Sequence, residues 1–327
     1  MKAILLKSFG DSQQLYLGET PKPIPKQNEI LIKTHHFALN RADILQRQGK
    51  YSPPQGASEI LGLEVVGEII EIGENVTDFE IGMFVFGLIS GGGYAEYAII
   101  PEKMAWLLPD FLTMREAVAI PEAFLTAYQA LFTLANLQIN ENILIHAGGS
   151  GIGTAMIQLA KINQSQQIFV TASPKKHQKC IELGATDCID YHTKNFSAEI
   201  QEITQKKGVN VVIDVIGGNY FHQNIDILAL DGRMVLLAIL GGYQTESINL
   251  MKIIGKRLTL LGSTLRNRPL SYQITLKNDF WTYSFELLKD KKIFPVIDSV
   301  WNWENIAHAH DYLENNQNIG KIIVDIS

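Results

Sequence analysis

Short apolar runs separated by glycine and proline dominate the first third of the chain. Ile30–Lys33 and Leu63–Ile72 have the composition and alternation of strands, and the second run ends at Gly73. Turn-forming residues recur between such runs, as in Pro21–Pro25 and Gly91–Gly93. Short strands with closely spaced turns predict a β-barrel or a partly open sandwich in this region.

From about residue 123 the apolar pattern changes to strands alternating with helices. Thr154–Ile162 and Lys175–Leu183 have apolar positions at helical spacing, and the second run stops at Gly184. The strand candidates of this region are Ile143–His146, Gln167–Ala172, Val211–Val215, Arg233–Ala238 and Leu258–Gly262. Strands alternating with helices of this length predict βαβ units around a parallel sheet.

These patterns divide the chain into three segments. Residues 123–265 are predicted to form a doubly wound α/β domain inserted into the β-rich domain of residues 1–122. The tail, residues 266–327, contains a helix candidate over Asn278–Lys289 and a strand candidate over Lys321–Ile326. We assign this tail back to the first domain.

A glycine loop follows the first strand of the α/β region and opens its first helix. Its spacing is G-x-x-G-x-G, and the same residues would also suit a simple tight turn. A strand before the loop and a helix after it favour a pyrophosphate site, because glycines let the backbone approach phosphates and the helix N-terminus presents free N–H groups. The loop residues predicted to bind a dinucleotide are Gly148, Gly149, Ser150, Gly151, Ile152 and Gly153.

The residues after the second strand distinguish between the two common dinucleotides. An NAD site usually carries Asp or Glu about 20 residues beyond the glycines, where it binds the ribose 2′-hydroxyl. Here the strand runs into Ser173-Pro174-Lys175-Lys176, which contains no acid. Ser173 and Lys176 would hold a 2′-phosphate that a carboxylate would repel, so NADP is predicted over NAD. The alternative is that both lysines are merely solvated at the start of a helix.

Composition and charge exclude several classes of protein. The 327 residues carry a net charge of −6, and the pI is about 5.8, which gives no reason to expect nucleic acid or an anionic membrane as a partner. The two cysteines, Cys180 and Cys188, cannot form a disulfide framework and are expected to belong to the packing of the α/β domain. The apolar run at the N-terminus is too short for a signal peptide and no stretch is long enough to span a membrane, so the cytoplasm is the expected location.

Four longer segments carry a resemblance to a known family. In these segments the chain resembles the zinc-free quinone oxidoreductases of the medium-chain dehydrogenase/reductase superfamily. The resemblance is strongest to the stress-inducible NADPH quinone oxidoreductase subgroup. The likeness spans essentially the whole chain and implies a GroES-like β-barrel domain with an inserted Rossmann domain. The segments are Ala38–Tyr51, Pro121–Ala127, Ile145–Gly153 and Asn318–Lys321. One departure is the turn Thr171-Ala172-Ser173, which is one residue shorter than the family's Thr-Ala-Gly-Ser.

The resemblance also implies which residues surround the cofactor. Asn40, Tyr51 and Thr126 would lie near the nicotinamide as the catalytic residues, and Tyr191 would join Ser173 and Lys176 near the 2′-phosphate. The rest of the dinucleotide path would be lined by Ile216, Ala238, Ile239, Gly241, Leu265, Arg266 and Asn318. Ordinary structural roles remain open for these positions, such as a solvated loop charge for Arg266.

No metal is expected. The zinc-using relatives place a cysteine and a histidine where this chain has Asn40 and Leu63, and leucine has no donor atom while an amide is a poor zinc ligand. Ser90–Tyr94 takes the place of their four-cysteine loop. His35 and His36 are adjacent in a predicted strand, so they point to opposite faces and cannot hold one metal.

Loss of zinc changes which chemistry is expected. Oxidation of an alcohol needs a Lewis acid or a base at the hydroxyl, whereas reduction of a quinone or an activated alkene needs mainly a well-placed nicotinamide. Asn40 would donate a hydrogen bond to the carbonyl oxygen, and a proton would come from Tyr51 or from water. NADPH-dependent reduction of quinones, by hydride or stepwise electron transfer, is therefore predicted. The alternatives are an alkenal or enone double-bond reductase and, more remotely, a non-enzymatic NADPH-binding or RNA-binding protein.

A homodimer is expected. Arg233–Ala238 and Leu258–Gly262 come late in the predicted sheet and would lie at its edge. An apolar edge must be covered or paired, and the family pairs it across a two-fold axis.

Overall fold

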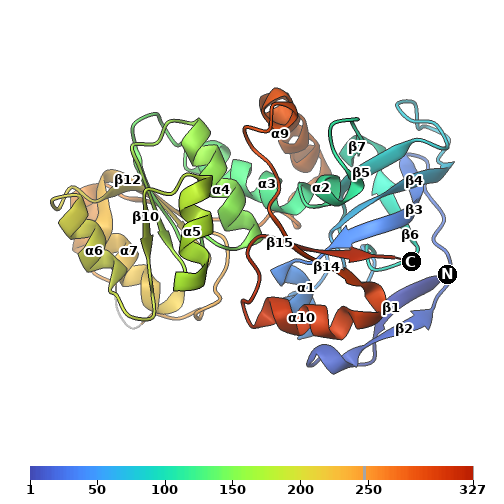
Figure 1. The fold of residues 1–327 in the computed structure, drawn as a ribbon, viewed down its shortest axis with the longest axis horizontal. Helices are drawn as coiled ribbons and strands as arrows, with labels where there is room; N and C mark the ends of the chain where they lie inside the picture. Colours follow the sequence, from blue (N-terminus) through green and yellow to red (C-terminus); the bar gives the residue numbers. More distant parts are fainter. Residues whose placement is uncertain (246–247, 327) are drawn as a thin grey trace. The chain divides into compact units, whose positions relative to one another are not determined.

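A computed structural model describes residues 1–245 and 248–326, and the chain divides into two compact units (Figure 1). Unit 1 comprises residues 1–125 and 266–327, and unit 2 comprises residues 126–265. The tail thus belongs to the same unit as the N-terminal segment, and the helix over Pro121–Tyr128 contains the position at which the chain enters unit 2.

Unit 2 is built on a six-stranded parallel sheet with the order β10-β9-β8-β11-β12-β13. The chain begins in the middle of this sheet, extends outward in one direction, and then returns to extend in the other. This is the 3-2-1-4-5-6 order of a doubly wound dinucleotide-binding domain, so the predicted fold class is confirmed. The strands are β8 (Asn142–Ile145), β9 (Gln167–Thr171), β10 (Asp187–Ile189), β11 (Val209–Asp214), β12 (Leu228–Leu236) and β13 (Thr259–Gly262).

Of the two late strands expected at the sheet edge, only one lies there. β13 is the edge strand, whereas β12 pairs with β11 on one side and with β13 on the other. The expectation was wrong for β12 because the return of the chain places each later strand outside the one before it.

The helices of unit 2 form two groups that cover the sheet (Figure 1). α4 packs against α5, while α7 packs against both α6 and α8. On the α6–α7 face, Leu144, Phe169 and Val212 of the strands are buried beneath Phe196 and Ile200 of α6. The helices are α4 (Gly151–Ile162), α5 (Pro174–Leu183), α6 (Phe196–Ile203), α7 (Phe221–Ile227) and α8 (Leu250–Lys256).

Unit 1 is organised around β3 (Glu29–Ala38), a long strand that pairs antiparallel with β4, β6 and β15. The seven-stranded sheet has the order β14-β15-β3-β4-β5-β7, with β6 attached to β3, and a separate hairpin joins β1 to β2. β15 therefore ties the tail of the chain to the N-terminal sheet. The remaining strands are β1 (Lys2–Leu6), β2 (Leu15–Glu19), β4 (Glu64–Ile72), β5 (Phe84–Leu88), β6 (Tyr97–Pro101), β7 (Ala105–Leu107), β14 (Ile297–Asn302) and β15 (Lys321–Asp325).

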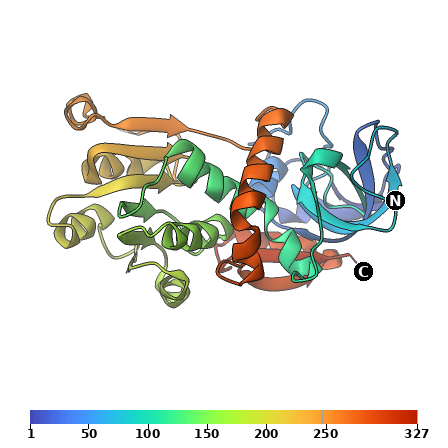
Figure 2. The same cartoon turned by 90° about the horizontal axis from the view of Figure 1, so that it is seen from above.

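The longest helix, α9, is the orange helix of Figure 2, and aromatic side chains on it contact the sheet of unit 1. Phe280 and Trp281 contact Trp106 of β7, and Trp281 also contacts Phe86 of β5. α9 begins directly after Pro269, earlier than predicted, because polar residues in its first turns hide the apolar spacing. The helices that begin in unit 1 are α1 (Arg41–Arg47), α2 (Met114–Val118), α3 (Pro121–Tyr128), α9 (Leu270–Lys289) and α10 (Ile306–Glu314).

Short helical turns complete the elements. They are the 3₁₀ segments Ser12–Gln14, Glu102–Met104, Gly218–Tyr220 and Trp303–Asn305, and the π-helical segment Gln129–Leu134. None of the helices in the described part of the chain is long and apolar enough to cross a membrane.

Candidate functional site

The glycine loop leaves β8 and enters α4, as the sequence predicts. Ser150 is the N-cap of α4, and its hydroxyl oxygen accepts a hydrogen bond from the Gly153 N–H at 3.0 Å. Ala147 has a φ of +54°, and the Gly148 N–H donates to the Thr171 carbonyl at 3.0 Å, which fixes the loop to the end of β9. The loop stands at the carboxyl end of β8, beside the point where the strand order reverses, and this is where doubly wound sheets bind ligands.

Lys176 lies over this loop. Its side chain is buried, and a Cβ added at Gly149 would meet the Lys176 Cδ at 2.5 Å, so a glycine is needed for this close approach. Ser173 is the N-cap of α5, and the Lys176 N–H donates to its carbonyl at 2.9 Å. Lys175 is exposed instead. Of the two adjacent lysines, Lys176 is therefore the one beside the loop.

A buried network holds the ends of three neighbouring strands together beneath the loop. His146 Nδ1 lies 2.9 Å from the Thr171 hydroxyl, and its Nε2 lies 2.8 Å from Asn224 Oδ1. The Asn224 amide donates to Asp214 at 3.0 Å, so its oxygen accepts from His146 Nε2–H. Burial lowers the pKa of His146, which keeps the ring neutral, and Nδ1 then accepts from Thr171. The Thr171 hydroxyl oxygen also accepts from the Ala147 N–H at 3.3 Å, so the network reaches the loop itself.

The other predicted cofactor residues of unit 2 follow the carboxyl ends of neighbouring strands. They are Ile216 after β11, Ala238, Ile239 and Gly241 after β12, Tyr191 after β10, and Leu265 after β13. The Gly241 N–H donates to the Ile216 carbonyl at 2.7 Å, which joins the β11 and β12 loops. Tyr191 is 38% exposed, whereas Leu265 is buried. Thr126 also belongs to unit 2, where it is buried in α3.

In unit 1, Asn40 is part of a buried charged group. Lys321 Nζ donates to Asn40 Oδ1 at 2.6 Å, to Glu64 Oε1 at 2.6 Å and to the Leu39 carbonyl at 2.9 Å. The Asn40 amide N–H donates to the same Glu64 oxygen at 2.9 Å, and the Glu122 backbone N–H donates to the other one at 2.8 Å. Because both ends of the Asn40 amide are engaged, its predicted hydrogen bond to a substrate carbonyl would have to compete with these contacts.

A second carboxylate lies beside this group. Burial raises the pKa of Asp43 to about 6, against the opposing effects of hydrogen bonds from the Asn40 N–H and the Tyr94 hydroxyl. The Tyr94 hydroxyl also contacts His310 Nε2 at 3.0 Å. Burial and the neighbouring Arg47 lower the pKa of His310 to about 3, so this histidine is neutral and structural.

Tyr51 and Arg266, both predicted site residues, lie together in unit 1. The Arg266 guanidinium carbon is 5.5 Å from the centre of the Tyr51 ring. Arg266 donates to the Ser90 carbonyl at 2.6 Å and to Gln46 Oε1 at 2.8 Å, so it is anchored and not a solvated loop charge. Burial and the nearby Glu122 raise the pKa of Tyr51, and its hydroxyl is therefore protonated at neutral pH.

Asn318 is a buried turn residue three positions before Lys321. Its amide donates to the Gly320 carbonyl at 2.6 Å, which shapes the turn that leads into Lys321. Four of the predicted site residues therefore belong to unit 1: Asn40, Tyr51, Arg266 and Asn318.

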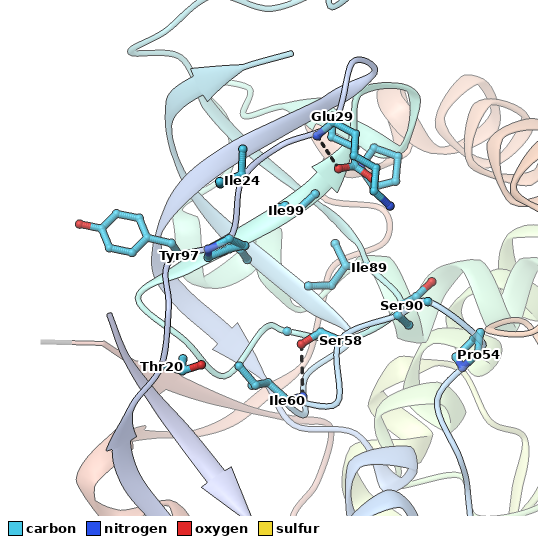
Figure 3. Close-up of a pocket in the computed structure, with 18 of the residues that line it drawn as sticks. Thr20, Ile24, Glu29, Pro54, Ser58, Ile60, Ile89, Ser90, Tyr97 and Ile99 are labelled. Carbon is cyan, nitrogen blue, oxygen red and sulfur yellow. Dashed lines mark hydrogen bonds between the residues drawn. The ribbon is translucent and has the colours of Figure 1, made fainter.

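A cavity of about 500 Å³ opens in unit 1 beside the segment that carries Ser90 (Figure 3). Ile24, Ile60, Ile89 and Ile99 contribute apolar side chains to its wall. The volume falls within the range of small-molecule pockets, and the lining mixes these apolar side chains with polar ones such as Thr20, Ser58 and Ser90.

The residues at the zinc positions do not fit a metal. Leu63 is buried in the core and has no donor atom, and the Asn40 oxygen already accepts from the Lys321 ammonium. Across residues 1–245 and 248–326, no three or more His, Cys, Asp or Glu side chains are grouped to hold an ion.

Sequence reasoning missed Glu64, Lys321, Glu122 and Gln46 as members of the unit 1 group. The available signal was a charge directly before an apolar run at the start of a strand, at Glu64 before Val65-Val66 in β4 and at Lys321 before Ile322–Val324 in β15. Charged residues are almost never fully buried unless they are paired. The partner of each could not be read from the sequence.

Comparisons with known proteins agree with this architecture. Residues 26–110 match the alcohol dehydrogenase GroES-like domain, and residues 151–278 match the zinc-binding dehydrogenase family. The human synaptic vesicle membrane protein VAT-1 homolog is 30% identical over 99% of this chain and 86% of its own length.

Two solved structures have the same fold over the whole chain. The quinone oxidoreductase from Coxiella burnetii is 29% identical, with a TM-score of 0.84, and the match covers 100% of this chain and 99% of that one. The JamJ enoyl reductase is 26% identical, with a TM-score of 0.88 and the same coverage. The GroES-like and Rossmann assignments are thereby confirmed, and the chain belongs to the medium-chain dehydrogenase/reductase superfamily of oxidoreductases.

Proposed function

We propose that this protein is an NADPH-dependent reductase of quinones that uses no metal. The observation that carries the cofactor assignment is Lys176, which is buried over Gly149 at the point where an NAD enzyme has a carboxylate. The similarity to a quinone oxidoreductase supports the choice of acceptor.

The residues present suit a dinucleotide phosphate. The α4 N-terminus and the loop from Gly148 to Gly153 would hold the pyrophosphate, while Ser173, Lys176 and Tyr191 would hold the 2′-phosphate. The loops after β11 and β12, joined through Gly241, would line the path toward the nicotinamide. Bound NADPH supplies a hydride, or electrons in separate steps, to the acceptor.

On the acceptor side, Tyr51 is the proposed proton donor. Its hydroxyl stays protonated at neutral pH because burial raises its pKa, and the Arg266 guanidinium lies beside its ring. The guanidinium would stabilise negative charge that develops on a reduced carbonyl oxygen. Thr126, Asn40, Leu265 and Asn318 complete the proposed site, with Asn40 placed by Glu64 and Lys321.

An enone or alkenal double-bond reductase is the second candidate, favoured by the similarity to an enoyl reductase. Both reactions use the same hydride source and an electrophile that needs no Lewis acid, so the acceptor alone distinguishes them.

NADPH oxidation measured against matched quinones and enones tests this function. We expect saturable turnover with quinones, one hydroquinone formed per NADPH consumed, and a large loss in kcat with Tyr51→Phe. Faster turnover of enones would favour the second candidate. NADPH binding without turnover of any acceptor would refute both and point to a non-enzymatic role.

We also propose a homodimer formed through the β13 edge. Leu260 of β13 is partly exposed, and Leu250, Met251 and Ile254 of the neighbouring helix α8 are 65%, 72% and 70% exposed. An apolar sheet edge beside an apolar helix face is a common association surface. An edge strand can pair with its own copy across a two-fold axis, which closes the assembly at two chains.

A further inference from the structure

A series of buried hydrogen bonds within unit 1 joins α10 to the backbone of Asn40, one of the proposed site residues. Arg47 Nη1, at the end of α1, lies 3.3 Å from His310 Nδ1 on α10, and His310 Nε2 lies 3.0 Å from the Tyr94 hydroxyl. That hydroxyl donates to Asp43 Oδ2 at 3.1 Å, and the Asn40 N–H donates to the same oxygen at 2.8 Å. The four side chains are fully buried, so bulk water does not replace any member of the series.

The direction of each bond in this series follows from its first member. A guanidinium only donates hydrogen bonds, so His310 Nδ1 must accept from Arg47 and carries no proton. Burial and Arg47 lower the pKa of His310 to about 3, so the ring is neutral and its single proton is on Nε2. Nε2–H then donates to the Tyr94 oxygen, which leaves the Tyr94 O–H to donate to Asp43.

A protonated Asp43 does not fit this series. Its Oδ2 accepts from the Tyr94 hydroxyl and the Asn40 N–H, and its Oδ1 accepts from the Gly62 N–H at 3.2 Å. If the carboxyl group donated to Tyr94, the tyrosine would have to turn its own proton toward the imidazole, where Nε2 already carries one. The series therefore favours the carboxylate, against the burial that raises the pKa of Asp43 to about 6.

We propose that Arg47 and His310 are positioning residues that act on Asn40 from outside the proposed site. They fix the direction of the hydrogen bonds through Tyr94, and this direction keeps Asp43 charged as the acceptor of the Asn40 N–H. The effect on turnover rests on the proposed function, whereas the hydrogen-bond direction does not.

The charge on Asp43 matters because its two oxygens hold two segments of the charged group. One oxygen accepts from Asn40, the N-cap of α1, and the other from Gly62, two residues before Glu64 of β4. The Asn40 side chain in turn donates to Glu64 at 2.9 Å. A carboxylate accepts hydrogen bonds more strongly than a neutral carboxyl group, so protonation weakens both backbone contacts and the placement of the Asn40 amide.

Other charged groups also act on Asp43, and the test must separate them from the series. Lys321 and Arg266 favour the carboxylate, whereas a charged Glu122 opposes it. These effects act through space and need no particular direction of the Tyr94 hydroxyl. Variants at Arg47 must therefore be compared with and without that hydroxyl.

The tautomer of His310 in the wild type tests the hydrogen-bond direction. Nitrogen-15 NMR of histidine-labelled protein distinguishes the two ring nitrogens, and His310→Gln identifies the signals. We expect a neutral ring with its proton on Nε2 from about pH 5 to pH 8. A proton on Nδ1, or an imidazolium in this range, would overturn the proposal, and this measurement needs no folded variant of Arg47.

Carbon-13 NMR of aspartate-labelled protein, assigned with Asp43→Asn, tests control of Asp43. In Arg47→Met the histidine proton is free to move to Nδ1, so the midpoint of the Asp43 titration should rise by about one pH unit. Arg41→Met is the matched control on the same helix, because Arg41 donates instead to the Leu313 carbonyl at 3.0 Å, and it should leave the midpoint in place. In a Tyr94→Phe background Arg47→Met should add no shift, and an equal shift there would show that the arginine acts through its charge alone and would overturn the series.

The pH profile of NADPH-dependent quinone reduction tests the link to turnover. We expect kcat/KM to fall as pH drops through the Asp43 midpoint, and Arg47→Met to move this acid limb upward as far as it moves the NMR midpoint. A merely structural role would lower kcat/KM equally at every pH and leave the limb in place, which would overturn the link to Asn40. A wild type that oxidises NADPH with no acceptor at any pH would refute the proposed function, while the NMR results would still decide the hydrogen-bond direction.

Discussion

Replacing Lys176 tests the cofactor assignment most directly. The side chain is 7% exposed, so its ammonium is largely shielded from water and salt, and a contact with a 2′-phosphate would be charge-assisted. Such a hydrogen bond contributes about 1.5–3 kcal/mol. Since about 1.4 kcal/mol corresponds to a factor of ten, loss of the charge should weaken NADPH roughly ten- to a hundred-fold. NADH lacks the phosphate and should lose little.

The structure suggests how to separate charge from packing. Lys176→Ala removes both the ammonium and the methylene groups that cover Gly149, whereas Lys176→Met removes the charge and keeps most of the covering chain. Lys175→Ala is the matched control, because Lys175 is exposed one position away. The assay is the dissociation constant of each dinucleotide, followed by protein fluorescence or calorimetry. Equal binding of NADH and NADPH by the wild type, or an equal loss of both in Lys176→Met, would refute the NADP assignment.

Three further predictions address the metal, the assembly and the buried carboxylate. Chelators should leave the rate of NADPH oxidation unchanged, because Asn40 and Leu63 do not suit a zinc ion. If the protein contains stoichiometric zinc, and chelation removes both the zinc and the activity, this conclusion is wrong. Sedimentation should show a dimer of the wild type. Leu260→Lys places like charges across the proposed two-fold axis and should therefore yield monomers. A wild-type protein that is monomeric at micromolar concentration would exclude the interface. Because the pKa of Asp43 is raised to about 6 in the fold, from an ordinary 3.8, its ionisation destabilises the folded state as pH rises. Relative to Asp43→Asn, the wild type should therefore lose about 3 kcal/mol of unfolding free energy between about pH 4 and pH 6, measured by urea unfolding, and a constant difference would contradict the shift.

The phosphate loop could be predicted because its signals are local. Gly148–Gly153, the strand before it and the helix after it occupy one continuous stretch, and the strand order places that stretch at the switch point. The difference between Lys175 and Lys176 also has a local cause, since Pro174 begins α5 and so fixes which lysine turns toward the loop. The start of α9 and the inner position of β12 could not be predicted, because they depend on polar turns that hide the apolar spacing and on the order of strand pairing.

The charged group of unit 1 could not be predicted because three distant segments build it. Asn40 caps α1, Glu64 begins β4 and Lys321 begins β15, and only the pairing of β3 with β4 and β15 brings them together. Each residue taken alone has an ordinary explanation in the sequence. That they form one group is evident only from the hydrogen bonds that the Lys321 ammonium donates in the folded structure.

That ammonium also bears on the chemistry. Lys321 Nζ has three N–H groups, and the Leu39 carbonyl, Asn40 Oδ1 and Glu64 Oε1 accept all three. Its charge is balanced by Glu64, which is itself fully buried. A zinc ion at a catalytic site keeps an open position for the substrate oxygen, whereas this ammonium keeps no donor free for one. The group can therefore position Asn40 but cannot polarise an unactivated alcohol or carbonyl, and this favours acceptors that are already electrophilic, such as quinones and conjugated alkenes.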